Sequence, residues 1–100
     1  MTAIRYFSLA RHALVEALRV INIQPGDAVA IPALICRDVL GSLATVGARP
    51  VFYHVDEMLK PMDFPYDSGV CAIIAVNYFG FAQNLDPFKH FCASTSLTLL

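Results

Sequence analysis

Two short apolar runs flank a stretch with helical spacing between residues 26 and 56. The runs are Ala28–Ile31 and Pro50–Val55, and the apolar residues of Arg37–Val46 recur on one helical face. A strand, a helix and a second strand in this order predict two parallel strands joined by a crossover. Because ligands bind at the carboxyl ends of parallel strands, the loop Pro32–Cys36 is the first place where we expect chemistry.

An apolar stripe predicts a first helix over Leu9–Asn22, and Ser8 before it is a typical N-cap residue. The turn Gln24–Asp27 that follows contains proline and glycine, which favour the φ angles of tight turns. In the second helix, Asp38 lies in the first turn, and Gly47 occupies the left-handed position that ends helices. The stripe of the first helix is formed by Ala10, Ala13, Leu14, Ala17, Leu18 and Ile21.

The second half of the chain repeats the alternation of strand and helix. Val70–Asn77 is apolar at nearly every position, so both faces of a strand there would be apolar; this predicts a strand buried on both faces. Asp56–Gly69 has no period and predicts a connection, with Asp67 and Ser68 among its turn residues. Asp86, as a cap, and the proline after it predict a third helix, with Phe88, Phe91 and Cys92 on its inward face. Ser96–Leu100 predicts the start of another strand.

These elements predict an α/β fold, with helices in layers on both sides of a mostly parallel sheet. A length of 100 residues allows one domain. The chain is 57% hydrophobic and only 15% charged, whereas ordinary soluble domains have about 45–50% and about 25%. We therefore expect residues 1–100 to be one partial domain of something larger, or a subunit with a wide apolar interface.

Charge and cysteine content exclude several classes of function. A net charge of −1 with seven scattered basic residues argues against nucleic-acid binding, which requires a basic face. No apolar run approaches the roughly 18 residues of a membrane span, and no secretory signal is expected. Cys36, Cys71 and Cys92 predict free thiols in a reducing, cytoplasmic compartment, two of them in the core. The three histidines are isolated, so no metal site is expected.

The beginning of the first helix is a candidate anion site. Helix N-termini present free N–H groups, the small Ala10 permits close approach, and Arg11 adds a bidentate donor. The alternative is an ordinary amphipathic helix with an arginine on its surface. The sequence contains neither a GxGxxG motif nor a Walker lysine, so it does not favour a nucleotide site.

Cys36 and the loop after the third strand are the other candidates. Cys36 begins the second helix beside Arg37 and is either a nucleophile or a small apolar residue that fills space under the loop. The segment Asn77–Phe81 contains aromatic residues that either form the wall of a site for a flat ligand or close the top of the core. Gly80 within it suggests a close backbone approach.

Four segments in register resemble the first part of the DegT/DnrJ/StrS-type sugar aminotransferases, pyridoxal-phosphate (PLP) enzymes of the fold-type I, aspartate-aminotransferase class. The segments are ARHALVEAL, IQPGDAVAIPAL, VGARPVFYHVD and VNYFGFAQNLD, and the resemblance spans about Phe7 to Leu100. It implies a partial large domain without the small domain. It also implies a homodimer that uses a keto-sugar and an amino-acid donor.

The resemblance also implies roles for particular residues. Ala10 and Arg11 fall where the family holds the cofactor phosphate, and Cys36 falls where an aromatic side chain often stacks on the pyridine ring. The chain departs from the family pattern at several positions: Leu9 and Ala10 replace Ser and Gly, Cys36 replaces the aromatic residue, Asn77 replaces a His and Asn84 replaces an Asp.

The lysine that anchors PLP in the family falls beyond Leu100, so we expect no catalytic residue in this chain and no activity by itself. Lys60 and Lys89 are its only lysines, and neither is expected in a desolvating pocket. Two alternatives remain open. The chain is a non-catalytic relative that acts as a scaffold, or it is an independent small α/β binding module.

Overall fold

The computed structural model describes residues 4–66, 69–95 and 97–100. Helices and strands follow one another in the predicted order, with a short 3₁₀ turn, η1, added before the third helix. The elements are α1 (Ala10–Val20), β1 (Ala28–Pro32), α2 (Arg37–Thr45), β2 (Arg49–Tyr53), β3 (Ala72–Ile73), η1 (Tyr78–Gly80), α3 (Asp86–Thr95) and β4 (Thr98–Leu99).

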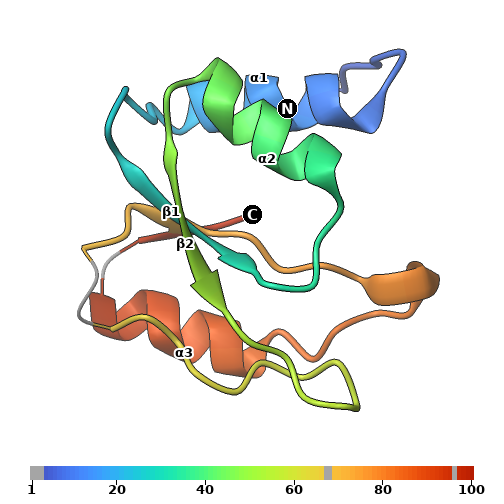
Figure 1. Cartoon of the computed structure of the whole chain (residues 1–100), viewed down its shortest axis with the longest axis vertical. Coiled ribbons are helices and arrows are strands. Elements are labelled where there is room, and N and C mark those ends of the chain that lie inside the picture. Colours follow the sequence, from blue (N-terminus) through green and yellow to red (C-terminus); the bar gives the residue numbers. More distant parts are fainter. Residues whose placement is uncertain (1–3, 67–68, 96) are drawn as a thin grey trace.

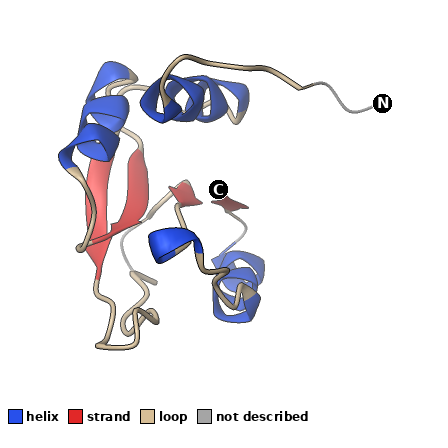
Figure 2. Ribbon diagram, turned by 90° about the vertical axis from the view of Figure 1, so that its right-hand side faces the viewer, coloured by secondary structure: helices blue, strands red, loops and turns tan. Residues whose placement is uncertain are grey.

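The strands of the described residues form one parallel sheet in the order β2-β1-β3-β4. Helices α1 and α2 cover one face of this sheet and α3 covers the other (Figures 1 and 2). The sheet therefore lies between two helical layers, which confirms the predicted three-layer α/β/α class.

β1 is the central strand of the core, and all five of its residues are buried. Val29 and Ile31 pack in the cluster that contains Leu18 of α1 and Leu43 of α2. Ala30 points to the other side, into a cluster with Phe88 and Phe91 of α3. A strand that is apolar at every position is needed here because both faces of a parallel sheet are covered.

Tyr53, at the end of β2, connects β2 to the far side of β1. Its ring is buried, and its hydroxyl donates a hydrogen bond to the Ile74 carbonyl oxygen at 2.6 Å. Because β1 lies between β2 and β3 in the sheet, this side chain reaches across the central strand. Burial, followed by the charge of Tyr78, raises the pKa of Tyr53 far above the usual tyrosine range, so the phenol stays protonated.

The turn before β1 and the turn before β2 are joined at the amino ends of the strands. The Gly26 N–H donates to the Gly47 carbonyl at 2.8 Å, and the Asp27 carboxylate accepts the Gln24 N–H at 2.8 Å. Gly47 has a φ of 74°, as predicted for a residue that ends a helix. A Cβ atom at this position would lie 3.0 Å from the Pro25 Cβ, so a side chain would not fit easily.

Several local predictions were wrong. Leu9, not Ser8, is the N-cap of α1, and no side chain caps this helix. In α3, Asp86 is the first helical residue instead of the cap. The prediction of two core cysteines also fails: Cys36 and Cys71 are exposed at the entries to α2 and β3, and only Cys92 is half-buried. Burial raises the pKa of the Cys92 thiol.

The predicted strand Val70–Asn77 is paired only over Ala72–Ile73. Backbone hydrogen bonds nevertheless continue on both sides of this pair, from the Cys71 N–H to Ala28 and from the Ala75 N–H to Leu100. The paired segment covers two residues against both neighbours, β1 and β4. Ser96, predicted to begin that strand, and Asp67 and Ser68 of the preceding connection lie outside the described residues.

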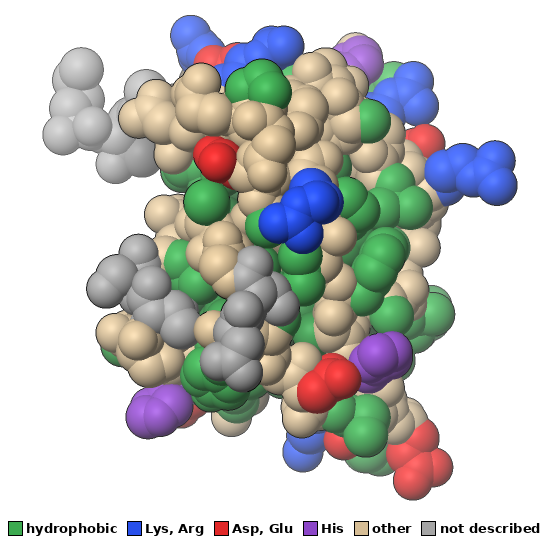
Figure 3. Space-filling model, turned by 60° about the vertical axis from the view of Figure 1, so that its left-hand side comes forward, with side chains coloured by type: hydrophobic (Ala, Val, Ile, Leu, Met, Phe, Trp, Pro, Cys, Tyr) green, Lys and Arg blue, Asp and Glu red, His purple; other side chains and the backbone are tan. Residues whose placement is uncertain are grey.

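Apolar side chains also reach the surface. Figure 3 shows them across the middle of one face, while Lys and Arg side chains gather mainly toward the end where α1 and α2 lie. Val20 is 70% exposed and Phe52, on the edge strand β2, is 48% exposed. Exposure of this kind fits a composition with few charged residues and favours further apolar contacts.

Two glycines in and after α2 give opposite predictions. We expect Gly47→Ala to lower the free energy of unfolding by about 1–2 kcal/mol, because alanine is strained at positive φ and meets Pro25 there. Gly41 lies inside α2, with open space where an alanine methyl group would lie, so Gly41→Ala should raise this free energy by about 0.5–1 kcal/mol. Urea unfolding of both variants measures the two effects, and changes of the same sign would contradict this account.

Candidate functional site

The beginnings of α1 and α2 lie on the same side of the molecule as the end of β1 and η1 (Figure 1). The Ser42 hydroxyl of α2 holds the two helices together, since it lies 3.0 Å from the Arg11 carbonyl oxygen and 3.2 Å from that of Asp38. Parallel α/β sheets bind ligands at this carboxyl edge. The structure therefore brings the predicted site residues Ala10, Arg11 and Cys36 to one edge of the sheet.

The first turn of α1 presents unpaired backbone donors. Ala10 is its first residue and is exposed, and the N–H groups of His12 and Ala13 bond to the Leu9 carbonyl oxygen. Among the described residues, the N–H groups of Ala10 and Arg11 have no hydrogen-bond partner, and no side chain caps the helix. This is the arrangement that favours an anion at a helix N-terminus.

The Arg11 side chain belongs to the first turn of this helix and already forms a weak ion pair. Its Nη1 is 3.5 Å from the Asp38 Oδ1, and both side chains are about half exposed or more. An exposed ion pair of this length contributes little to stability, so an anion at the start of α1 competes with a weak contact only. Asp38 also places a negative charge near that anion.

Cys36 is the N-cap of α2 and is exposed at the end of the loop that follows β1. The interpretation of this residue as a filler under the loop is therefore wrong. The beginning of the loop is held in place, because the Ala33 N–H donates to the Tyr53 carbonyl oxygen at 2.7 Å and the Leu34 carbonyl oxygen accepts the Tyr78 hydroxyl at 2.7 Å. Desolvation raises the pKa of the Tyr78 phenol.

The aromatic residues of Asn77–Phe81 do not close the core, which corrects one of the two interpretations given above. Phe79 is 89% exposed and Phe81 is 78% exposed. Nothing approaches Gly80 within 4 Å of a Cβ position, so its role is its positive φ of 79° and not a close contact. The Asn77 carboxamide oxygen accepts the Gln83 N–H at 2.8 Å and so organises the loop.

A hairpin over residues 54–63 follows β2, where the sequence indicated only an irregular connection. Val55 pairs with Pro61 in an antiparallel bridge, and Asp63 accepts from both the backbone N–H and the ring Nδ1 of His54, at 2.6 and 2.9 Å. These bonds from His54 lower the pKa of the Asp63 carboxyl. Inside the hairpin, the Asp56 Oδ1 accepts the N–H groups of Met58 and Lys60.

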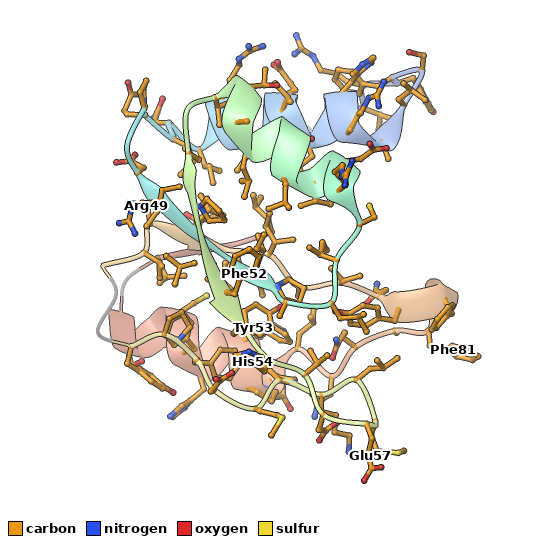
Figure 4. All side chains as sticks on the ribbon, in the orientation of Figure 1. Arg49, Phe52, Tyr53, His54, Glu57 and Phe81 are labelled. Atoms are coloured by element: carbon orange, nitrogen blue, oxygen red, sulfur yellow. The ribbon has the colours of Figure 1, made fainter. Side chains whose placement is uncertain are left out.

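The hairpin and the loop after η1 enclose a cleft of about 530 Å³. Its walls include Asp56 and Lys60 on one side and Tyr78, Phe81 and Gln83 on the other. Figure 4 shows Glu57 at the tip of the hairpin, turned away from the chain, and Phe81 at the outer end of the opposite loop. Sequence reasoning missed this cleft because nothing in the spacing of residues 56–87 indicates that the two segments meet.

Two kinds of feature are absent from the described part of the chain. No helix there is long and apolar enough to cross a membrane. No three His, Cys, Asp or Glu side chains of these residues are grouped so that they would hold a metal ion.

The sequence model of the DegT/DnrJ/EryC1/StrS aminotransferase family matches residues 6–100. The chain belongs to this family. No curated protein matches the sequence significantly.

Solved aminotransferases share the fold. The chain is 25% identical to 3-amino-5-hydroxybenzoic acid synthase, with a TM-score of 0.77, and the match covers 89% of this chain and 24% of that protein. TlmJ, an aminotransferase from Streptoalloteichus hindustanus, is 25% identical to the chain with a TM-score of 0.73, and the match covers 89% of this chain and 26% of TlmJ. Spr1654 from Streptococcus pneumoniae is described as a sugar aminotransferase and was solved in a PLP form. Its sequence identity to the chain is 27% and the TM-score is 0.68, and the match covers 89% of this chain and 24% of Spr1654. The chain spans about a quarter of the length of these relatives.

The family and the partial α/β fold are therefore as the sequence predicted. The cofactor roles of Ala10, Arg11 and Cys36 stay predictions, although the structure places all three at the carboxyl edge. Tyr78 was missed as a residue that holds the Cys36 loop, because a tyrosine in an aromatic run gives no sign of which hydroxyl finds a partner.

Removing the Tyr78 hydroxyl tests its hold on the loop of this aminotransferase-family chain. We expect Tyr78→Phe to speed hydrogen exchange of the Ala33 amide about fivefold, since one lost hydrogen bond is worth about 1 kcal/mol of local stability. Tyr66→Phe is the control, because the Tyr66 side chain is exposed and packs against Phe64, away from this loop. Equal exchange rates in the two variants would show that the bond does not hold the loop.

Acid should release the hairpin at residues 54–63. Because the pKa of Asp63 is lower in the folded chain than in the unfolded one, its contribution is complete above the unfolded value of about 3.9. It is lost as the pH falls through the lower, folded-state value. NMR shifts of the His54 and Met62 amide protons should follow this titration, and Asp63→Asn should abolish it. A midpoint at or above the unfolded value would contradict the bonding to His54.

Proposed function

We propose that this chain forms the first part of the large domain of a PLP-dependent aminotransferase that transfers an amino group from an amino acid to a keto-sugar. We propose also that the chain does not catalyse this transfer by itself. Membership of the aminotransferase family, and a fold that matches about a quarter of the length of solved aminotransferases, support the first statement. The uncapped beginning of α1 at the carboxyl edge is the observation that carries it.

The cofactor phosphate fits the beginning of α1. The free N–H groups of Ala10 and Arg11 point out of the helix, and the methyl side chain of Ala10 leaves room for an anion. The Arg11 guanidinium is exposed, and among the described residues its one ion-pair contact is with Asp38 at 3.5 Å. These residues bind and orient the phosphate, in the way that a helix dipole and a bidentate donor favour.

Cys36 would lie against the ring of the cofactor. Its thiol is exposed at the end of a loop that Tyr78 and Tyr53 hold in place. When bound, PLP supplies an electron sink for the amino-group transfer. The chain's own contribution is to position the cofactor. The Cys36 thiol covers less of the cofactor ring than an aromatic side chain would.

The exposed position of both lysines supports the proposed lack of activity. Lys60 lies in the hairpin after β2 and Lys89 lies on α3, and both are exposed. A lysine that forms a covalent bond with PLP is normally desolvated, so that its amine is neutral and nucleophilic. The anchoring lysine of the proposed reaction must therefore come from another segment.

A non-catalytic relative that acts as a scaffold is the second candidate. Asp38 favours it, because a carboxylate 3.5 Å from Arg11 competes with phosphate for the guanidinium. Both candidates include a homodimer in the cytoplasm. The exposed apolar side chains, among them Val20 and Phe52, support association with further protein surface.

Binding of PLP to the chain tests the proposed phosphate seat. We expect weak, reversible binding in equilibrium dialysis, and we expect Arg11→Ala to raise the Kd about tenfold, as the loss of one charge-assisted hydrogen bond implies. Arg19→Ala is the matched control, because Arg19 lies in the last turn of the same helix. Equal losses in the two variants would overturn the seat at the beginning of α1.

The same chain, supplied with PLP, an amino acid and a keto-sugar, should form no amino-sugar. Transfer by the 100-residue chain alone would contradict the proposed lack of activity. If the folded chain shows no affinity for PLP, that result would favour the non-catalytic scaffold.

A further inference from the structure

A groove between α1 and α2 combines apolar surface with cationic side chains. It has a volume of about 460 Å³, and Phe7 and Val15 give it apolar surface while Arg11 and Arg19 give it positive charge. Gly41 lines it from α2, and no atom lies within 4 Å of the position of a Cβ there. The α1–α2 groove therefore has room for a side chain from another protein surface.

The positive charge of the α1–α2 groove is incompletely neutralised. Among the described residues, the Arg19 side chain has no ion-pair partner. The Glu16 carboxylate also lines the groove, but it is already paired with Arg5 at 2.7 Å. Arg11 contacts Asp38 at 3.5 Å, which is a weak pair. A partner for this groove should therefore bring a negative charge, with an apolar side chain beside it.

The tip of the 54–63 hairpin has this chemistry. Glu57 and Met58 are both exposed, and within the described part of the chain the Glu57 carboxylate has no hydrogen-bond or ion-pair partner. The Asp56 carboxylate fixes the tip by accepting the N–H groups of Met58 and Lys60. A tip that is ordered before it docks loses little free energy to ordering, and methionine adapts well to an apolar surface.

Charge is also divided between the two ends of the molecule. The first fifty residues contain five of the seven basic residues, and the last fifty contain five of the eight acidic ones. Helices α1 and α2 lie at one end and Glu57 lies at the opposite end, so the tip does not reach the groove of its own chain (Figures 1 and 4). Opposite charges at opposite ends favour a head-to-tail approach of two copies.

We propose that the hairpin tip of one copy docks in the α1–α2 groove of a second copy. In this contact, Glu57 pairs with Arg19, and Met58 packs against Val15, which lies one turn before Arg19 on α1. The two surfaces differ, so the contact is heterologous and builds rings or open chains of copies. It does not rest on the proposed function, because neither Arg19 nor Glu57 belongs to the proposed phosphate seat.

Sedimentation equilibrium of charge-reversed variants tests the contact. We expect the wild-type chain to associate with a Kd on the order of 0.1 mM at low salt. Arg19→Glu and Glu57→Arg should each raise this Kd about fivefold or more, because two like charges replace an ion pair. The double variant should recover the wild-type Kd, because the pair is then restored with its signs exchanged. Lys89→Glu is the matched control: it changes the charge by the same amount on α3, outside the groove and the hairpin.

Salt separates this contact from general apolar association. Raising the salt to about 0.5 M should weaken association of the wild type, since exposed ion pairs are screened and apolar contacts are not.

Four results would contradict the head-to-tail contact. They are equal Kd values for Arg19→Glu and Lys89→Glu, no recovery in the double variant, association that salt does not weaken, and a wild-type chain that stays monomeric up to about 1 mM. A monomer whose Val15 and Arg19 amide signals shift with poly-L-glutamate would assign the groove to a different acidic protein. The dialysis of PLP with Arg11→Ala fails separately, since its control, Arg19→Ala, removes the ion pair of this contact and not the phosphate seat.

Discussion

The hydrogen bond from the Tyr53 hydroxyl to the Ile74 carbonyl oxygen spans the width of β1 and fixes β2 and β3 relative to each other. It is formed in the layer between the sheet and α3, where the Tyr53 ring packs edge-on against Phe88 at 5.9 Å. A buried carbonyl oxygen without a partner would be costly, so the bond holds the strand ends in one arrangement. The loop that leads to Cys36 and the hairpin at residues 54–63 leave the sheet from these ends.

Those loops serve two separate places on the molecule. The loop after β1 leads to Cys36 and the beginning of α2, beside the free N–H groups of α1. The segments after β2 and β3 turn to the α3 side and enclose the cleft. Tyr78 connects the two places, because its ring lines the cleft while its hydroxyl holds the Leu34 carbonyl oxygen. A ligand in the cleft would therefore contact a side chain that also positions the Cys36 loop.

The sequence predicted the elements that depend on apolar periodicity. β1, α2 and the inward face of α3 follow from local patterns, because burial on a given face requires apolar residues at a fixed spacing. The 54–63 hairpin did not follow, since its bonds join His54 to Asp63 and Asp56 to two nearby N–H groups without any periodic signal. The cysteine predictions failed because the burial of a thiol depends on its place at the end of an element and not on its hydrophobicity.

The hydrogen bond between Gly26 and Gly47 joins the turns at the amino ends of β1 and β2, opposite the edge where the strands end. Two turns are pressed together there, with Pro25 against a glycine that has no room for a methyl group. Lengthening either turn would separate them and shift the register of β1 against β2. Inserted residues and grafted loops should consequently be rejected at the beginnings of β1 and β2.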